Sequence, residues 1–191
     1  MTNLSIPGFE IEPGALVPIA SGFNSDVFKH HDTIVKISKR SRSNLGAKES
    51  LAQCIDEYNV TARYLGDTAV NTAFHIAEYP TKTGRFIVVT MQPFIEGVAL
   101  AKAADTVNED ALKAMYDSAL NRYADTGVIP DLACIEKGLF DARRSPNVIV
   151  TPEGNPKLVD PNSGKLQKSR VFGPIWNLCI SRGVRRALYE M

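Results

Sequence analysis

The sequence has few of the features that identify secreted, zinc-binding or membrane proteins. Its 191 residues include 3 cysteines, which are odd in number, far apart and without CxxC spacing. They argue against a disulfide framework or a zinc site, and a reducing compartment fits best. No apolar run approaches the roughly 20 residues that cross a bilayer. The first residues, MTNLSIPGFEIEPG, contain acids and prolines where a signal peptide needs a basic start. We therefore expect a cytoplasmic protein without a membrane partner.

An excess of charge of one sign is also missing. The chain has 22 basic and 21 acidic residues, a net charge of +1, so nucleic acid is not expected as a partner. Hydrophobic residues make up 44% and charged residues 23%, a balance typical of folded globular domains. The sequence shows no internal repeat, and its length fits one domain or two small lobes.

The first half of the chain alternates β-prone runs with turn residues. From Ala15 to Ile37 the pattern predicts three antiparallel strands. Apolar residues then recur at helical spacing between Leu51 and Leu65, and this predicted helix ends near Gly66. Two further β-prone runs, TAFHIAEY and RFIVVTM, are separated by PTKTG. The first part of the chain is therefore predicted to be five strands and one helix.

The second half is predicted to be mainly helical, with one hairpin. An apolar stripe predicts a helix from Asn108, a plausible N-cap, to about Asp125, with Gly127 as its C-cap. The runs NVIV and KLVD flank TPEGNP, whose proline, glycine and asparagine favour a tight turn. A last helix is expected at roughly residues 175–188, interrupted by Gly183.

Two positions in the first half suggest a site for phosphates. Lys36 lies in the apolar strand TIVKIS, where an unpaired ammonium is costly to bury and should face anions. Glu57 lies nearest the margin of the helical apolar stripe and is the best candidate partner for Lys36. Gly22, in a turn between strands, would let backbone N–H groups approach phosphates. The alternatives are a solvated lysine, a solvated glutamate and an ordinary hairpin.

The segments SGFNSDVF, TIVKIS, VVTMQPFIEG, SPNVIV and KLVDP, together with Glu57, occur in the order of the protein-kinase-like superfamily. The resemblance spans residues 15–162. Within the superfamily, the chain is similar to aminoglycoside kinases and to serine/threonine kinases. It implies an α+β, two-lobed fold. Residues 1–96 would form a lobe with a five-stranded antiparallel sheet and one helix. Residues 97–191 would form a shortened helical lobe with a β-hairpin, and the two would make one structural unit.

The resemblance also implies ATP and Mg²⁺ as cofactors. Gly22, Lys36, Glu57 and Met91, which lies in the exit strand VVTMQPFIEG, would bind the nucleotide. SPNVIVTPEGNPKLVD looks like the stretch in which an asparagine and a hairpin-terminal aspartate bind magnesium. Asn147 and Asp160 occupy those two positions, and an amide and a carboxylate are the hard oxygen ligands that Mg²⁺ prefers.

Two aspartates compete for the role of catalytic base. TGVIPDL resembles the kinase run GIIHRDL and nominates Asp131, although Asp131 precedes Asn147 by 16 residues rather than the usual handful. Asp141, in FDARRSPN, has the expected spacing but less similar surroundings. We prefer Asp131 by a small margin and treat ACIEKGLFDA as an insertion. Arg143 and Arg144 would neutralise transferred phosphate or form a solvated pair.

The sequence departs from the kinase pattern after Asp160. Pro161 and Asn162 replace the familiar phenylalanine and glycine, and an APE-like stretch is missing. The leading hypothesis is an ATP-dependent phosphotransferase that acts on an unknown hydroxyl acceptor, either a small molecule or a protein. The alternative is a pseudokinase that binds a nucleotide or a protein without turnover. A third reading is a plain α+β interaction domain.

Overall fold

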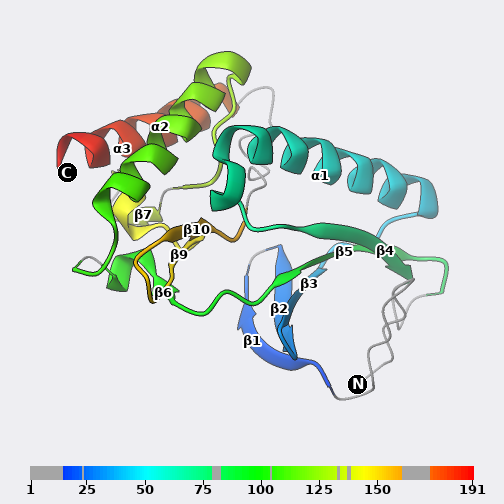
Figure 1. The fold of residues 1–191 in the computed structure, drawn as a ribbon. Coiled ribbons are helices and arrows are strands. Elements are labelled where there is room, and N and C mark those ends of the chain that lie inside the picture. Colours follow the sequence, from blue (N-terminus) through cyan, green and yellow to red (C-terminus); the bar gives the residue numbers. More distant parts are fainter. Residues whose placement is uncertain are drawn as a thin grey trace. The chain divides into compact units, whose positions relative to one another are not determined.

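A computed structural model describes residues 15–22, 24–78, 83–103, 105–132, 134–136, 139–160 and 173–191 (Figure 1). Pro161 and Asn162 lie outside these residues. The chain divides into two compact units, Met1–Asp56 with Asn71–Phe94, and Glu57–Val70 with Ile95–Met191. The expected lobes were residues 1–96 and 97–191, so the observed division differs chiefly in giving Glu57–Val70 to the second unit.

The first unit contains the expected five-stranded antiparallel sheet. Its strand order is β1-β2-β3-β5-β4, which places β3 at the centre. His31, with φ 50°, makes the turn between β2 and β3. Figure 1 shows β1 to β3 in blue and β4 and β5 in green. The strands are β1 Val17–Ser21, β2 Ser25–His30, β3 Thr33–Ser38, β4 Ala73–Glu78 and β5 Phe86–Pro93.

The register of β3 and β5 determines which side chains share a face of this sheet. Lys36 pairs with Thr90, and two residues away Ile34 pairs with Gln92. Residues directly opposite each other in antiparallel strands project to the same face, and alternate residues along a strand also share it. Val35 pairs with Met91 and therefore lies on the other face. There both belong to a cluster with buried Ala77, Ile87 and Val89.

Helix α1, Asn44–Leu65, crosses the boundary between the two units after Asp56. Its start is stabilised by Ser43, whose Oγ accepts a hydrogen bond from the Gly46 N–H at 3.2 Å. Its end at Leu65 agrees with the predicted stop near Gly66, which has φ 52°. A short 3₁₀ turn, Gly66–Thr68, follows.

Helix α2, Glu109–Thr126, confirms both predicted caps. Asn108 Oδ1 accepts from the Ala111 N–H at 3.0 Å, and Gly127, with φ 69°, donates its N–H to Tyr123 O at 2.8 Å. Helix α3, Gly173–Tyr189, runs through Gly183 without the expected interruption. A Cβ at Gly183 would lie 2.7 Å from Phe140 O, so the glycine permits close packing of this helix against a neighbouring strand.

Short strands accompany these helices in the second unit. The predicted hairpin is β9 Val148–Val150 with β10 Pro156–Leu158, and it is joined by β6 Val98–Ala99 in the order β10-β9-β6. A second hairpin, β7 Cys134–Glu136 and β8 Leu139–Asp141, lies in the segment that was interpreted as an insertion. Besides the 3₁₀ turn Gly66–Thr68, the described part of the unit contains the 3₁₀ turns Leu100–Lys102 and Ala142–Arg144.

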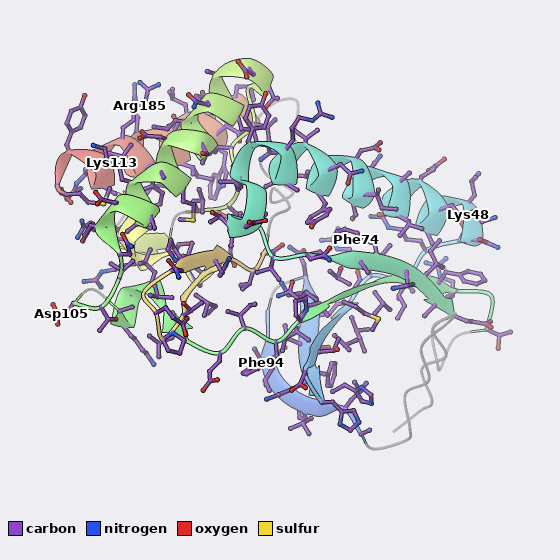
Figure 2. The ribbon with its side chains drawn as sticks, in the orientation of Figure 1. Lys48, Phe74, Phe94, Asp105, Lys113 and Arg185 are labelled. Carbon is purple, nitrogen blue, oxygen red and sulfur yellow. The ribbon has the colours of Figure 1, made fainter. Side chains whose placement is uncertain are left out.

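The core of the second unit lies between α2, α3 and the β9–β10 hairpin. Buried residues come from each of these elements, from the chain after α2, and from the end of α1 and the turn that follows. The exposed side chains of Lys113 on α2 and Arg185 on α3 project outward from their helices (Figure 2). None of the helices within the described residues is long and apolar enough to cross a membrane. The larger buried side chains of the second unit's core include Leu65, Leu112, Met115, Tyr116, Ile129, Leu132, Val148, Leu158, Ile180 and Val184.

Candidate functional site

The β9–β10 hairpin brings the two predicted metal-binding residues to the same end. Asn147 directly precedes β9, and Asp160 follows β10 by two residues. The Val159 N–H donates to Asn147 O at 2.8 Å, which extends the pairing of the two strands to the residue before Asp160. Asn147 and Asp160 therefore lie beside each other because of the hairpin register, as their spacing in the sequence predicted.

Asp131 belongs to the same group of residues. Asn147 Nδ2 donates a hydrogen bond to the backbone oxygen of Asp131 at 2.8 Å. The segment that carries Asp131 is fixed on both sides, because Ile129 and Leu132 are fully buried. The Ile129 N–H also donates to Oδ1 of buried Asn177 on α3 at 3.1 Å. Asp131 and Asn147, which are 16 residues apart in the sequence, are thus in direct contact.

The two carboxylates of this group influence each other. Burial and, to a smaller extent, the negative charge of Asp160 together raise the pKa of Asp131 to about 6. A cation near both carboxylates would relieve this repulsion. The bond to Asp131 uses the amide nitrogen of Asn147, so the amide oxygen remains available as a ligand. The set of donors, oxygen atoms of a carboxylate and an amide, fits Mg²⁺.

Asp141, the competing base, has a structural role in the described residues. Its Oδ1 accepts from the Arg143 N–H at 3.0 Å and caps the 3₁₀ turn Ala142–Arg144. Its Oδ2 lies 3.6 Å from Arg144 Nε. Arg143 in turn contacts Glu109 on α2, with Nη2 to Oε2 at 3.1 Å. These contacts favour a local structural explanation for Asp141 and both arginines, whereas Asp131 lies with Asn147.

The turn around Gly22, in the first unit, is held by a lysine that the sequence interpretation did not identify. Lys39 Nζ donates to Ser21 Oγ at 2.8 Å and to Gly22 O at 2.7 Å, and it lies 3.2 Å from Asp26 Oδ1. The Gly22 N–H donates to Ser25 O at 2.9 Å. A Cβ at Gly22 would be 3.5 Å from Ser25 O, an ordinary contact, so space does not require glycine there.

Lys36 is half-buried on β3, and the strand register places Gln92 rather than Met91 on its face of the sheet. Gln92 was not predicted as a site residue, although strand alternation would have found it once the pairing of β3 with β5 was known. Glu57 is half-buried in the part of α1 that belongs to the second unit. Burial lowers the pKa of Arg122, and the negative charge of Glu57 opposes this. Pairing of Glu57 with Lys36 stays a prediction.

Comparison with known proteins gives a result for the fold. No protein-family model matches the sequence, and neither does any curated protein. Solved structures do match, among them the pseudokinase domain of BIR2, an immune regulator of the RLK/Pelle family. The match has a TM-score of 0.51 and 10% identity, and it covers 93% of this chain and 64% of that domain. With the five-stranded antiparallel sheet and the helical unit that follows it, this similarity shows that the chain has an α+β, protein-kinase-like fold.

Proposed function

We propose that this protein binds ATP with Mg²⁺ and transfers the terminal phosphate to a hydroxyl group. The observation that carries the proposal is the grouping of Asp131, Asn147 and Asp160, in which Asn147 Nδ2 bonds to Asp131 O at 2.8 Å and Asp160 raises the pKa of Asp131. A half-buried carboxylate and a pair of oxygen ligands are the parts that a magnesium-dependent phosphotransferase needs from this region.

Each residue has a distinct role in the proposed reaction. Asn147 and Asp160 would hold the metal ion, which neutralises charge on the phosphate oxygens when bound. Asp131 would accept the proton of the acceptor hydroxyl. The hydroxyl oxygen would then form a bond to the terminal phosphorus while the bond from that phosphorus to ADP breaks and ADP leaves. A carboxylate within hydrogen-bond distance of the acceptor hydroxyl can take up this proton. Lys36 and the Gly22 turn would orient the phosphates, with Glu57 as the partner of Lys36.

A regulatory module that binds nucleotide without turnover is the second candidate. The matched BIR2 domain is described as a pseudokinase, and that similarity favours this candidate for the present chain. The unusual 16-residue separation of Asp131 from Asn147 is consistent with it as well. Both candidates require the same nucleotide site and differ only in whether phosphate is transferred.

Thermal melting with ATP and Mg²⁺, combined with measurement of phosphate release, separates these candidates. The wild type is compared with Lys36→Ala and Asp160→Asn. Asp117→Asn, an exposed aspartate on α2, is the matched control. We expect magnesium-dependent stabilisation by ATP that Lys36→Ala and Asp160→Asn weaken and Asp117→Asn leaves unchanged.

The outcomes have different meanings. Stabilisation without phosphate release, with any acceptor tested, would favour the regulatory module. A wild type that ATP and Mg²⁺ do not stabilise would exclude both nucleotide-binding candidates and leave a regulatory module of this fold that binds a protein, or a plain interaction domain. Phosphate transfer that survives Asp160→Asn would show that the metal is held elsewhere.

A further inference from the structure

Helix α3 carries a stripe of large side chains on its exposed side. Its members follow one another at intervals of three or four positions, which keeps them on one side of the helix. They are Ile175, Leu178, Arg182, Arg185 and Tyr189. The isoleucine, leucine and tyrosine are 63%, 40% and 91% exposed, and Arg185 projects outward in Figure 2. Aromatic and arginine side chains are enriched where proteins bind each other, so this stripe suits a protein partner.

Helix α2 carries a stripe of small and acidic side chains with the same spacing. Its members, all exposed, are Asp110, Ala114, Asp117, Asn121 and Ala124. The exposed charged residues of α2 are four acids and one lysine, whereas α3 contains three arginines and no acid. The exposed sides of the two helices are therefore complementary in charge and in the size of their side chains.

The charges at the middle of both stripes are not neutralised within one chain. Arg186, beside the α3 stripe, is paired with Glu190, with Nε 2.9 Å from Oε1. For Asp117 and Arg182, no ion pair is found in the part of the chain that the structure describes. A partner that brings an arginine to α2 and a carboxylate to α3 would pair both charges.

Helices α2 and α3 pack against each other and run in roughly opposite directions (Figure 1). A two-fold axis along the boundary of their exposed sides would place α2 of each copy opposite α3 of the other, also antiparallel. In one register of this arrangement, Asp117 lies opposite Arg182 of the second copy. The equal spacing of the stripes then puts Ala124 opposite Ile175 of the second copy. The acidic first half of α2 faces the half of α3 that carries the arginines.

We propose that α2 and α3 form a self-association surface through which two copies of this chain make a symmetric dimer. A dimer built on α3 alone would bring the arginines of the two copies together, and one built on α2 alone would bring the aspartates together. The pairing of α2 with α3 joins opposite charges instead, and two-fold symmetry makes this contact twice in a closed dimer. The surface contains none of the residues of the proposed function and does not depend on it.

The test measures the dissociation constant of the dimer by analytical ultracentrifugation of the full chain at low and high salt. The variants are Arg182→Glu and Asp117→Arg, each of which puts like charges opposite each other twice per dimer. Arg63→Glu, at an exposed position on α1, is the matched control. We expect each variant to raise the Kd at least about tenfold and the control to leave it unchanged.

Two combinations of these substitutions test the pairing itself. The double variant with both Arg182→Glu and Asp117→Arg reverses the ion pair, so it should regain most of the lost affinity. An equimolar mixture of the two single variants should form a mixed dimer, because both of its contacts then join opposite charges. A double variant that stays monomeric, although its circular dichroism matches that of the wild type, would overturn the pairing.

The wild type alone can also overturn the proposal. Exposed ion pairs are screened by salt, so a dimer that high salt does not weaken would contradict it. This measurement needs no variant and decides the matter if a substituted chain does not fold. A wild type that stays monomeric at millimolar concentration would overturn the dimer. If that monomer binds a synthetic acidic amphipathic helix or phosphatidylserine vesicles, the surface belongs to a different partner.

Discussion

Lys39 stabilises the turn between β1 and β2 through three oxygen atoms at once. Its ammonium contacts Ser21, Gly22 and Asp26, and its backbone N–H donates to Asn24 O at 2.9 Å. The side chains are more than a third exposed, so the charge pair itself contributes little in water. Its effect is geometric, because the arrangement fixes the backbone of the turn that we expect to cover phosphates.

The Asp26 carboxylate makes this arrangement sensitive to acid. The hydrogen bond from Ser21 lowers the pKa of Asp26, and Lys39 lowers it further. A carboxyl with a lowered pKa stabilises the fold above its ordinary pKa, and this contribution is lost as the pH falls through the folded value. We therefore expect Asp26→Asn to lower the melting temperature slightly at pH 6, and this difference from the wild type to shrink as the pH falls below the ordinary aspartate pKa of 3.8. Asp56→Asn, an exposed helical aspartate, should show no such pH-dependent difference.

The two candidate bases should respond to substitution in opposite ways. Asp141 caps a turn, so Asp141→Ala should reduce stability by about 1 kcal/mol and leave ATP binding intact. Asp131 is half-buried and its pKa is raised to about 6, so its ionisation destabilises the fold as the pH rises above the ordinary value of 3.8, with the full effect above about pH 6. Asp131→Asn should therefore raise the melting temperature at pH 8 without metal and reduce phosphate transfer at least ~100-fold. Loss of transfer in Asp141→Ala alone would reverse this assignment.

At the level of elements, the sequence predicts the long periodic segments and misses the shortest ones. The five strands of the first sheet, α1, α2 and the β9–β10 hairpin were all predicted, because each has its own periodicity or turn signal. β6 has two residues and pairs with β9, about 50 positions later, so nothing local reveals it. Gly183 was expected to interrupt the last helix. The sequence does not show that a glycine is needed there for close contact with Phe140 in the folded chain.

The candidate site shows the same limit. Asn147 and Asp160 could be placed side by side from the sequence because one hairpin connects them, whereas the face on which Met91 lies depends on a strand pairing that the sequence does not state. The nucleotide-binding role of Met91 stays a prediction. The observed register puts Met91 and Gln92 on opposite faces of the sheet, and only Gln92 shares the face of Lys36. Lys39 was missed for a similar reason, since its partners lie on two other strands.

Close packing of α3 on β8 can be tested at Gly183. Alanine favours helices by about 1 kcal/mol over glycine, yet its Cβ would lie 2.7 Å from Phe140 O and 3.1 Å from Phe140 Cβ. Because the backbone must shift to admit it, we expect Gly183→Ala to destabilise the protein by roughly 1–3 kcal/mol in urea unfolding. Gly46→Ala in α1, where the nearest atom is the side-chain Oγ of Ser43 at 3.3 Å, is the control and should be neutral or slightly stabilising.

At the scale of the whole molecule, the second unit depends on residues 57–70, which precede β4 and β5 of the first unit's sheet in the sequence. Leu65 and Ala69 belong to the core of the second unit. Tyr64 Oη donates to Asp125 Oδ2 at 2.7 Å, and the Val70 N–H donates to Leu158 O at 3.1 Å. Residues 57–70 are therefore part of this unit's structure, although β4 and β5 separate them from residue 95.

A fragment of residues 95–191 should for this reason be much less stable than the full chain. It loses two buried apolar residues of the core, at a cost of roughly 3 kcal/mol or more, together with the bonds to Asp125 and Leu158. Trp176, the only tryptophan in the sequence, lies edge-on to Phe140 at 5.2 Å between ring centroids, so its fluorescence reports this unit during urea unfolding. Joining residues 57–70 to residue 95 through a flexible linker should restore most of the lost stability. Equal urea midpoints for the fragment and the full chain would show that the second unit folds without the end of α1.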